Sequence, residues 1–403
     1  MDVTSDRSSP RNRTREEIFR VMQGGGALTR ARLVEATGLS RSTVNHAVTR
    51  LIAEGRVTEG DPAVKGPGSG SGRPAGVLRC VPRRTNSAAL DFGHTHVKAA
   101  VVDGSGHMIA QRRADLDVDH GAADAMDAAA DMLGALRRDH DVDALSTVVV
   151  GIPGPLDSAS GLVRSPTILS SWVGLDPRRE LEHRLGLRVH VENDAVLGAY
   201  GELRRGAGQG YTDFLYVKVS HGIGAGMVLG GEPYRGSLGF AGEIGHTPLP
   251  GYTELCRCGR RGCLEAVVSV SSVMAQVAHT HPGLGPGASP LEQPDDPTTR
   301  RILNDAGRML GGVLSVLSNL LNPAALIIGG ELGATGGPLL EGVASAVRRD
   351  AQPAIAASLD IVPAQLGENA ELVGAAALAG TMALRPGGAV RGRGGGATPG
   401  RAV

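Results

Sequence analysis

Short apolar runs alternate with longer segments of helical periodicity over most of the chain. The short runs are rich in Val, Ile, Leu and Ala and end in glycine or turn residues, which predicts strands. They span residues 87–93, 96–104, 145–154, 187–195, 213–222 and 324–330. Residues 121–139 and 299–322 repeat apolar positions at helical spacing and predict two helices. Alternation of strands with helices predicts an α/β fold.

The N-terminal part has a purely helical pattern. Residues 14–23 predict one helix, and residues 28–57 predict a helix, a tight turn and a second helix. Thr29 and Ser40 are the expected N-caps of the two later helices, and Gly38 falls in the turn between them. One face of the second helix is apolar and should pack inward; it carries Val44, Val48, Leu51 and Ile52.

Polar residues occupy the start of that second helix and point away from its apolar face. They are Arg41, Ser42, Asn45 and His46. A DNA-recognition helix uses this end to reach base edges in the major groove. Residues 55–60 and 72–81 predict two strands of a wing, where Arg73 would enter a minor groove. The pattern predicts a winged helix-turn-helix that binds DNA; the alternative is a three-helix module that binds protein.

Two low-complexity stretches suggest where domains begin and end. The glycine-rich residues 65–76 follow the predicted helices, and a second glycine-rich stretch closes the chain. We expect a DNA-binding domain at residues 14–82 and a larger domain at residues 86–385. Residues 386–403 cannot bury apolar surface and predict a disordered tail.

Composition limits the function classes. The 403 residues carry a formal net charge of zero, so contact with nucleic acid would have to come from a local basic region. No run approaches the roughly 20 apolar residues of a membrane span, and the polar N-terminus has no apolar signal core. These features predict a cytoplasmic protein without membrane contact. The chain has only four cysteines, which argues against a disulfide scaffold.

Three of the four cysteines lie close together in the sequence. Cys256, Cys258 and Cys263 follow His246 within a polar, glycine-rich stretch. Zinc takes four such ligands in a tetrahedron, and a site with four protein ligands has a structural role. This pattern predicts a structural Zn²⁺ site. The alternatives are a disulfide with one spare thiol, which the odd number disfavours, and unpaired core cysteines, which the polar surroundings disfavour.

The stretch GEIGH…CRCGRRGCLE, residues 242–265, resembles the signature of the ROK family of repressors, open reading frames and sugar kinases. The resemblance extends over residues 14–385, and the attached winged helix is similar to the family's sugar-responsive repressors of the xylose and N-acetylglucosamine type. It implies an actin-like, ribonuclease-H-like domain of two α/β lobes with a sugar bound in the cleft between them.

The resemblance also implies sugar-binding residues. The stretch VENDA corresponds to a family motif in which Asn193 would bind a sugar hydroxyl, and Asp194 stands where the kinases keep their catalytic base. Glu243, His246 and Glu265 complete the implied set. Carboxylate, amide and imidazole groups suit hydroxyls that both donate and accept. His246 would bind zinc through one ring nitrogen and face the sugar with the other. Outside this motif context, each acidic residue would be read as a helix cap or surface charge.

The phosphate-binding loops of the family's kinases are altered in this chain. The first kinase loop reads Asp-x-Gly-Gly-Thr-Lys, and here His94 and His96 replace its second glycine and its lysine. The second reads Gly-Thr-Gly-x-Gly-x-Gly, and here Ser220 and His221 replace its first two residues. An imidazole obstructs the close approach of backbone to phosphate. Because these phosphate-binding residues are replaced, we expect no catalytic residue and no kinase activity.

Some nucleotide-side features persist. Asp91 and Thr95 remain in the first loop, and the glycine pair Gly329–Gly330 resembles one that contacts nucleotide in the kinases. Residual ATP binding and weak phosphorylation therefore stay open at the level of the sequence.

Together, these patterns predict a sugar-responsive, DNA-binding transcriptional regulator of the repressor type. It would bind an operator as a homodimer or homotetramer and respond to a sugar or a sugar phosphate. Two alternatives remain: an ATP-dependent sugar kinase with a DNA-binding head, and a zinc-dependent scaffold with no small ligand.

Overall fold

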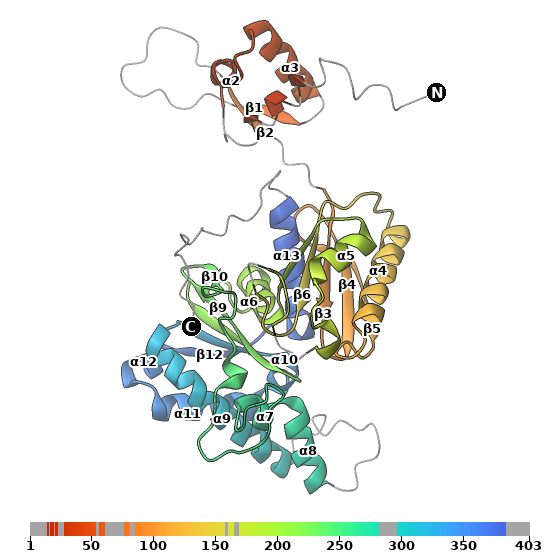
Figure 1. The fold of residues 1–403 in the computed structure, drawn as a ribbon. Coiled ribbons are helices and arrows are strands. Elements are labelled where there is room, and N and C mark those ends of the chain that lie inside the picture. Colours follow the sequence, from red (N-terminus) through yellow and green to blue (C-terminus); the bar gives the residue numbers. More distant parts are fainter. Residues whose placement is uncertain are drawn as a thin grey trace, which may run out of the picture. The chain divides into compact units, whose positions relative to one another are not determined.

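The computed structural model describes residues 14–15, 17–19, 21–22, 28–53, 56–60, 76–80, 85–157, 160–164, 169–281 and 296–383. The chain divides into two compact units at residues 84 and 85, and the ribbon of each is shown in Figure 1. Arg73 and the predicted tail at residues 386–403 lie outside the described residues.

The first unit is a small helical domain with a two-stranded sheet. Its helices α2 (Arg30–Thr37) and α3 (Arg41–Ala53) follow helical residues at 17–19 and 21–22. Its strands β1 (Val57–Gly60) and β2 (Val77–Cys80) pair in antiparallel register. This is the order of elements that the sequence predicts for a winged helix-turn-helix.

Local capping explains where the two helices begin and end. The Thr29 hydroxyl accepts a hydrogen bond from the Arg32 N–H, and the Ser40 hydroxyl accepts one from the Thr43 N–H at 3.2 Å. Gly38 ends α2 in the left-handed conformation, with φ of 67°, which L side chains rarely adopt. The predicted caps and turn are confirmed.

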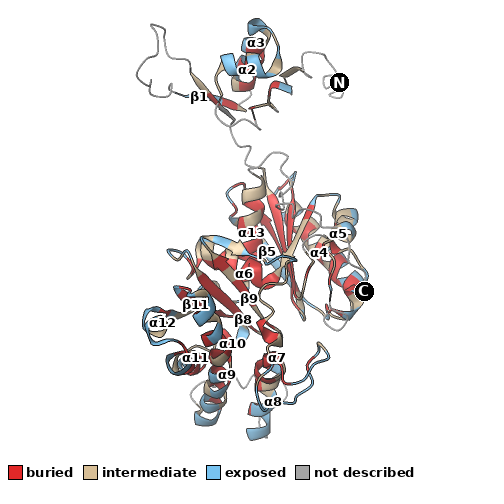
Figure 2. Cartoon of the chain, turned by 60° about the vertical axis from the view of Figure 1, so that its left-hand side comes forward, coloured by how far each residue is buried: buried red, intermediate tan, exposed pale blue. Residues whose placement is uncertain are grey.

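The apolar face of α3 forms the core of the first unit. Its residues Val44, Val48 and Leu51 are fully buried, whereas the opposite face is exposed (Figure 2). The same core includes Leu33 of α2 and Leu78 of β2. Helix α3 is therefore held by one face and presents the other to solvent.

The second unit contains two five-stranded sheets with the same strand topology. In strand order, the first sheet consists of β5 (Met108–Asp115), β4 (His96–Val102), β3 (Ser87–Phe92), β6 (Val148–Ile152) and β7 (Val189–Asn193). The second consists of β10 (Glu232–Tyr234), β9 (Ile223–Leu229), β8 (Phe214–Val219), β11 (Ala325–Gly329) and β12 (Asp360–Pro363). In each, three antiparallel strands are followed by two parallel ones. This repeated topology is the predicted two-lobed α/β fold, and each sheet defines one lobe.

Helices cover both faces of each sheet. On the first sheet, α4 (Ala122–Asp139) packs with α5 (Pro177–Leu185), while α13 (Ala370–Ala383) packs on the opposite side. On the second sheet, α6 (Asp194–Arg205) lies opposite α9 (Pro297–Leu321) and α11 (Gly337–Asp350). The shorter helices are η2 (Ser170–Trp172), η3 (Ile244–His246), α7 (Leu264–Val268), α8 (Val270–Thr280), α10 (Gly330–Gly333), α12 (Pro353–Ser358) and η5 (Gly367–Asn369). In the part of the chain that the structure describes, no helix has the length and apolar character needed to cross a membrane.

Helices α6 and α13 join the two lobes by a close backbone contact. A Cβ atom added at Gly374 would lie 1.8 Å from the carbonyl oxygen of Leu197, and one added at Gly201 would lie 2.4 Å from that of Ala370. Only glycine permits this approach. The contact fixes the first turns of both helices, which carry Asp194 and Glu371, against each other beside the cleft.

Candidate functional site

A cleft of about 530 Å³ lies between the two lobes. Its walls include the β3–β4 turn of the first lobe and the β8–β9 turn of the second. All five residues that the sequence predicts to bind sugar line this one cleft: Asn193, Asp194, Glu243, His246 and Glu265. They come from separate parts of the chain, and the fold brings them together.

The junction of β7 and α6 holds the first two of these residues rigidly. Asn193 is the N-cap of α6: its Oδ1 accepts the Val196 N–H at 3.1 Å, and its Nδ2 donates to the Gly154 carbonyl at 3.0 Å. Asp194 is buried, and its Oδ1 accepts the Ala195 N–H at 2.7 Å. Both side chains therefore have fixed orientations at the cleft wall.

Lys218 is a cleft residue that the sequence analysis missed. Its ammonium donates to Asp194 Oδ2 at 2.9 Å and lies 3.5 Å from Glu371 Oε1. Burial alone would lower the pKa of Lys218, but the carboxylates of Asp194, Glu371 and Asp91 raise it well above its ordinary value. The detectable signal was a single lysine in the otherwise apolar strand FLYVKV. Lys218 keeps its charge and engages the carboxylate of Asp194.

The remaining sugar-binding candidates lie around η3 and the start of α7. His246 Nε2 is 3.7 Å from Glu243 Oε2. Glu265 is buried, and its Oε2 accepts the Ile223 N–H at 3.0 Å. Burial, followed by the charges of Asp194 and Glu265, raises the pKa of Glu243 to about 7. These residues therefore offer hydrogen-bond acceptors together with one carboxyl, that of Glu243, that can carry a proton.

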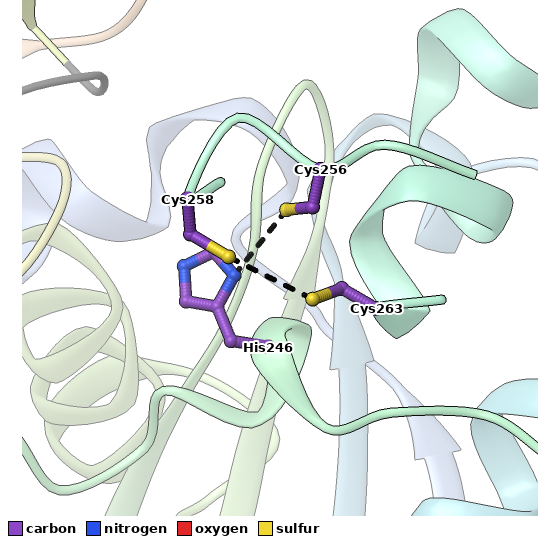
Figure 3. Close-up of side chains that lie close together, drawn as sticks. All are labelled: His246, Cys256, Cys258 and Cys263. Atoms are coloured by element: carbon purple, nitrogen blue, oxygen red, sulfur yellow. Dashed lines mark hydrogen bonds between the residues drawn. The ribbon is translucent and has the colours of Figure 1, made fainter. Parts of the chain in front are cut away.

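His246 and the three cysteines form a compact ligand cluster (Figure 3). Their ligand atoms all lie within 4.8 Å of one another; Cys256 Sγ is 3.6 Å from His246 Nδ1, and Cys258 Sγ is 3.7 Å from Cys263 Sγ. Zn–S bonds of 2.3 Å place two sulfurs of a tetrahedron about 3.8 Å apart. Donor chemistry and spacing therefore fit a bound metal ion. His246 directs Nδ1 to the cysteines and Nε2 toward Glu243.

The altered first loop forms internal contacts. His94 Nδ1–H donates to Asp119 Oδ1 at 2.7 Å, and His96 Nε2 lies 3.7 Å from Asp91 Oδ2. Burial alone would raise the pKa of Asp91, but the neighbouring His96 and the nearby lysine charges lower it. The side chains that replace the kinase glycine and lysine are thus engaged with carboxylates of the protein.

The second loop also satisfies its own backbone groups. The Ser220 hydroxyl accepts the Glu331 N–H at 3.1 Å, and the Ser220 N–H donates to the Gly222 carbonyl at 3.0 Å. The Ile223 N–H is already bonded to Glu265. A phosphate cradle depends on such amides, and these three are bonded within the protein.

Arg257 connects the metal-ligand loop to the other lobe. It lies between Cys256 and Cys258, and its Nη1 is 3.0 Å from Asp119 Oδ2 in the loop before α4. Asp119 therefore binds both Arg257 and His94. This pair could not be predicted from the sequence, because an exposed arginine has no distinguishing pattern.

In the first unit, the four predicted DNA contacts share the exposed side of α3. They are Arg41, Ser42, Asn45 and His46, and all four are exposed. The residues that alternate with them pack into the core of that unit. The helix thus has the form of a recognition helix.

The chain matches two protein-family models and a known repressor. A model described as "ROK family" matches residues 87–382, and one described as "Winged helix-turn-helix DNA-binding" matches residues 11–58. The xylose repressor of Bacillus spizizenii is 27% identical over 377 residues, 93% of this chain and 96% of the repressor.

Two solved structures are similar in fold. A ROK family transcriptional regulator, a homologue of the E. coli MLC protein, has a TM-score of 0.67 at 22% identity and covers 92% of this chain and 96% of its own. A Streptomyces griseus glucokinase, in complex with glucose and AMPPNP, has a TM-score of 0.64 at 29% identity. The alignment with the glucokinase covers 73% of this chain and 98% of the kinase.

Proposed function

The chain belongs to the ROK family, and we propose that it is a sugar-responsive transcriptional repressor in which sugar binding to the cleft controls operator binding. The xylose repressor aligns with 93% of the chain, and the winged helix-turn-helix match covers its N-terminal part. The glucokinase alignment leaves about a quarter of the chain unmatched. The chain is thus a DNA-binding regulator, as the sequence predicts, and the kinase alternative has weaker support.

One observation carries the proposal for a sugar ligand. The five candidate residues line a single cleft and come from β7, α6, η3 and α7. Together they offer an amide, an imidazole and three carboxylates at fixed positions. Sugar hydroxyls both donate and accept hydrogen bonds, so such a set of groups satisfies several of them at once. We propose Asn193, Asp194, Glu243, His246 and Glu265 as the sugar-binding residues.

The other half of the cleft supports a sensor over a kinase. A kinase base must be free to take a proton from the accepting hydroxyl, whereas Asp194 is paired with a charged lysine. The backbone amides of Ser220, Ile223 and Glu331, at the turn that would cradle phosphate, are bonded within the protein. The glucokinase similarity and the retained Asp91 favour kinase activity as a second candidate, but these contacts oppose it.

We propose that the ligand cluster binds Zn²⁺ through His246, Cys256, Cys258 and Cys263. With four protein ligands, the metal would have a structural role. It would fix His246 so that Nε2 faces the cleft, where a sugar hydroxyl could bind. In this arrangement the metal holds one wall of the sugar site in place.

We further propose that the regulator acts in the cytoplasm as a homodimer or homotetramer on operator DNA. Arg41, Ser42, Asn45 and His46 would contact bases, and Arg73, outside the described residues, would enter a minor groove. Sugar must bind one conformation of the regulator more tightly than the other to change its affinity for DNA. The domains at residues 14–82 and 86–385, and the disordered tail at residues 386–403, stay sequence predictions.

Operator titration tests the proposal. Binding of the full-length protein to its upstream DNA is measured with a panel of monosaccharides, disaccharides and sugar phosphates, each with and without ATP. We expect one sugar class to change operator affinity without ATP. Unchanged affinity with every sugar would refute the sensor, and ADP release at ordinary enzymatic turnover would favour the kinase.

A further inference from the structure

We propose that the cleft half which would hold phosphate in a kinase is a second sugar subsite, so that the effector is a neutral disaccharide or glycoside spanning both halves. This inference rests on the proposed sugar-binding function and specifies its ligand. The second subsite consists of His94, His221, Arg257 and Glu331, all of which line the cleft.

The second subsite adjoins the first directly. A Cβ atom placed on Gly222 would be 3.3 Å from Glu265 Oε2 and 3.6 Å from His94 Nε2. Glu265 of the first subsite and His94 of the second therefore both lie beside Gly222. A ligand that binds Glu265 and extends past Gly222 reaches His94 without leaving the cleft.

The side chains of the second subsite suit hydroxyl groups. His94 donates Nδ1–H to Asp119, which leaves Nε2 on the cleft side, where it can hydrogen-bond a hydroxyl. The rings of His94 and His221 are 6.4 Å apart between centroids, and His221 Nδ1 is 4.0 Å from Glu331 Oε2. That last distance is too long for a hydrogen bond, so both groups can bind a hydroxyl. Arg257 adds donors at the rim.

The charge of this half argues against a phosphate. Arg257 is neutralised by Asp119, while Glu331 contributes an exposed carboxylate. Burial, followed by opposing effects of its charged neighbours, lowers the pKa of His221 and favours its neutral ring. Lys98, Arg113 and Lys218 also line the cleft, each beside a carboxylate of the protein. With these cations paired, and without available amides from Ser220, Ile223 and Glu331, an anionic group gains little here.

The size of the cleft agrees with a ligand of two sugar units. Its volume of about 530 Å³ lies in the range of sites that enclose drug-sized molecules. The five first-subsite residues are only part of its lining. His94, His221 and Arg257 line the same cleft, so its volume includes the space beside them.

Calorimetric titration of the full-length, zinc-loaded protein tests the inference with matched probes. The pairs are glucose with cellobiose and maltose, xylose with xylobiose, and N-acetylglucosamine with chitobiose; glucose 6-phosphate and N-acetylglucosamine 6-phosphate are the anionic probes. For the sugar type that binds, we expect the disaccharide to bind at least about tenfold more tightly than the monosaccharide, the gain from one or two added hydrogen bonds. The phosphates should bind no more tightly than the monosaccharide.

Variants test whether the second subsite is the source of the higher affinity for the disaccharide. His221→Ala and Glu331→Ala should each reduce disaccharide affinity several-fold while changing monosaccharide affinity less than twofold. Glu341→Ala, an exposed carboxylate on α11 outside the cleft, is the matched control and should change neither.

Each other outcome counts against the inference. Equal affinity for mono- and disaccharide, a preference for the phosphate, or equal losses for both sugars in the variants would overturn the second subsite and leave the sensor intact. If none of the probes binds, the proposed function fails and the inference fails with it.

Discussion

The ammonium of Lys218 lies 2.9 Å from Oδ2 of Asp194, the residue that the sequence resemblance aligns with the catalytic base of ROK kinases. A second carboxylate, from Glu371, lies 3.5 Å from the same ammonium. Three elements therefore meet at one buried charge: strand β8 and the first turns of α6 and α13. Lys218 balances carboxylates that would otherwise repel each other.

Replacing Lys218 should destabilise the second unit. Lys218→Met leaves buried carboxylates without their cation, and breaking a buried pair from one side costs about 3–5 kcal/mol. Urea unfolding followed by circular dichroism measures the loss. Lys218→Met combined with Asp194→Asn removes one unpaired carboxylate and should recover part of the stability. A double variant less stable than the single one would show that the pair is not the source of the loss.

The metal cluster should control the sugar response but not the DNA-binding fold. Cys258→Ser removes one of four ligands, so we expect lower zinc content together with loss of sugar-dependent operator release. Elemental analysis and operator titration measure the two effects on the same preparation. Cys80→Ser changes the one cysteine outside the cluster and serves as the control. If Cys258→Ser lost zinc but kept its sugar response, the metal would not be what holds the sugar-binding residues in place.

Structural features that follow from a local sequence pattern could be predicted. The sequence patterns predict strands β3, β4, β6, β7, β8 and β11 and helices α4 and α9. Burial on one or both faces of these elements produces a regular spacing of apolar residues. Strand β5 was missed because its eight residues are largely exposed and include two arginines. Strand β9 was missed because its glycines were read as a phosphate loop.

Long-range pairs could not be read from the sequence. The metal ligands lie close together in the chain, so their spacing revealed them. Asp119 and Arg257 are 138 residues apart, and Lys98 contacts Asn369 across 271 residues. A single charged residue carries no local pattern that identifies its partner, and only the fold shows it.

Contacts of α3 with DNA can be tested with a control on the same helix. Asn45→Ala should cost about 1–3 kcal/mol of operator binding and relax the preference at one base pair, as expected for a base-edge contact. Arg50→Ala alters an exposed residue in the last turn of α3, away from its leading end, and should leave that preference unchanged. Fluorescence anisotropy with a set of single-base operator variants measures both. Equal effects of the two substitutions would argue against a recognition role for Asn45.

The Arg257–Asp119 pair should couple the lobes. Arg257 is half exposed, with 53% of its side chain accessible, which limits the interaction to about 1 kcal/mol. A double-mutant cycle with Arg257→Ala and Asp119→Asn, measured on sugar affinity, should give a coupling of that order. The single tryptophan reports the same loop, because Trp172 Nε1–H donates to the Val118 carbonyl beside Asp119. Additive single effects would show that the lobes are not coupled through this pair.

Asp119 should also contribute to stability against acid. Burial alone would raise its pKa, but the hydrogen bond from His94 and the charges of His94 and Arg257 lower it below the ordinary 3.8. A carboxylate with a lowered folded-state pKa contributes stability above its unfolded value, and loses it as the pH falls through the folded value. Wild type should therefore lose stability below about pH 4 more steeply than Asp119→Asn, which cannot titrate. Thermal unfolding at pH values from 7 to 3 compares the two proteins, with Asp115→Asn, an exposed aspartate on β5, as the control. If the stability of Asp119→Asn and that of wild type fell equally as the pH is lowered, the lowered pKa of Asp119 would be contradicted.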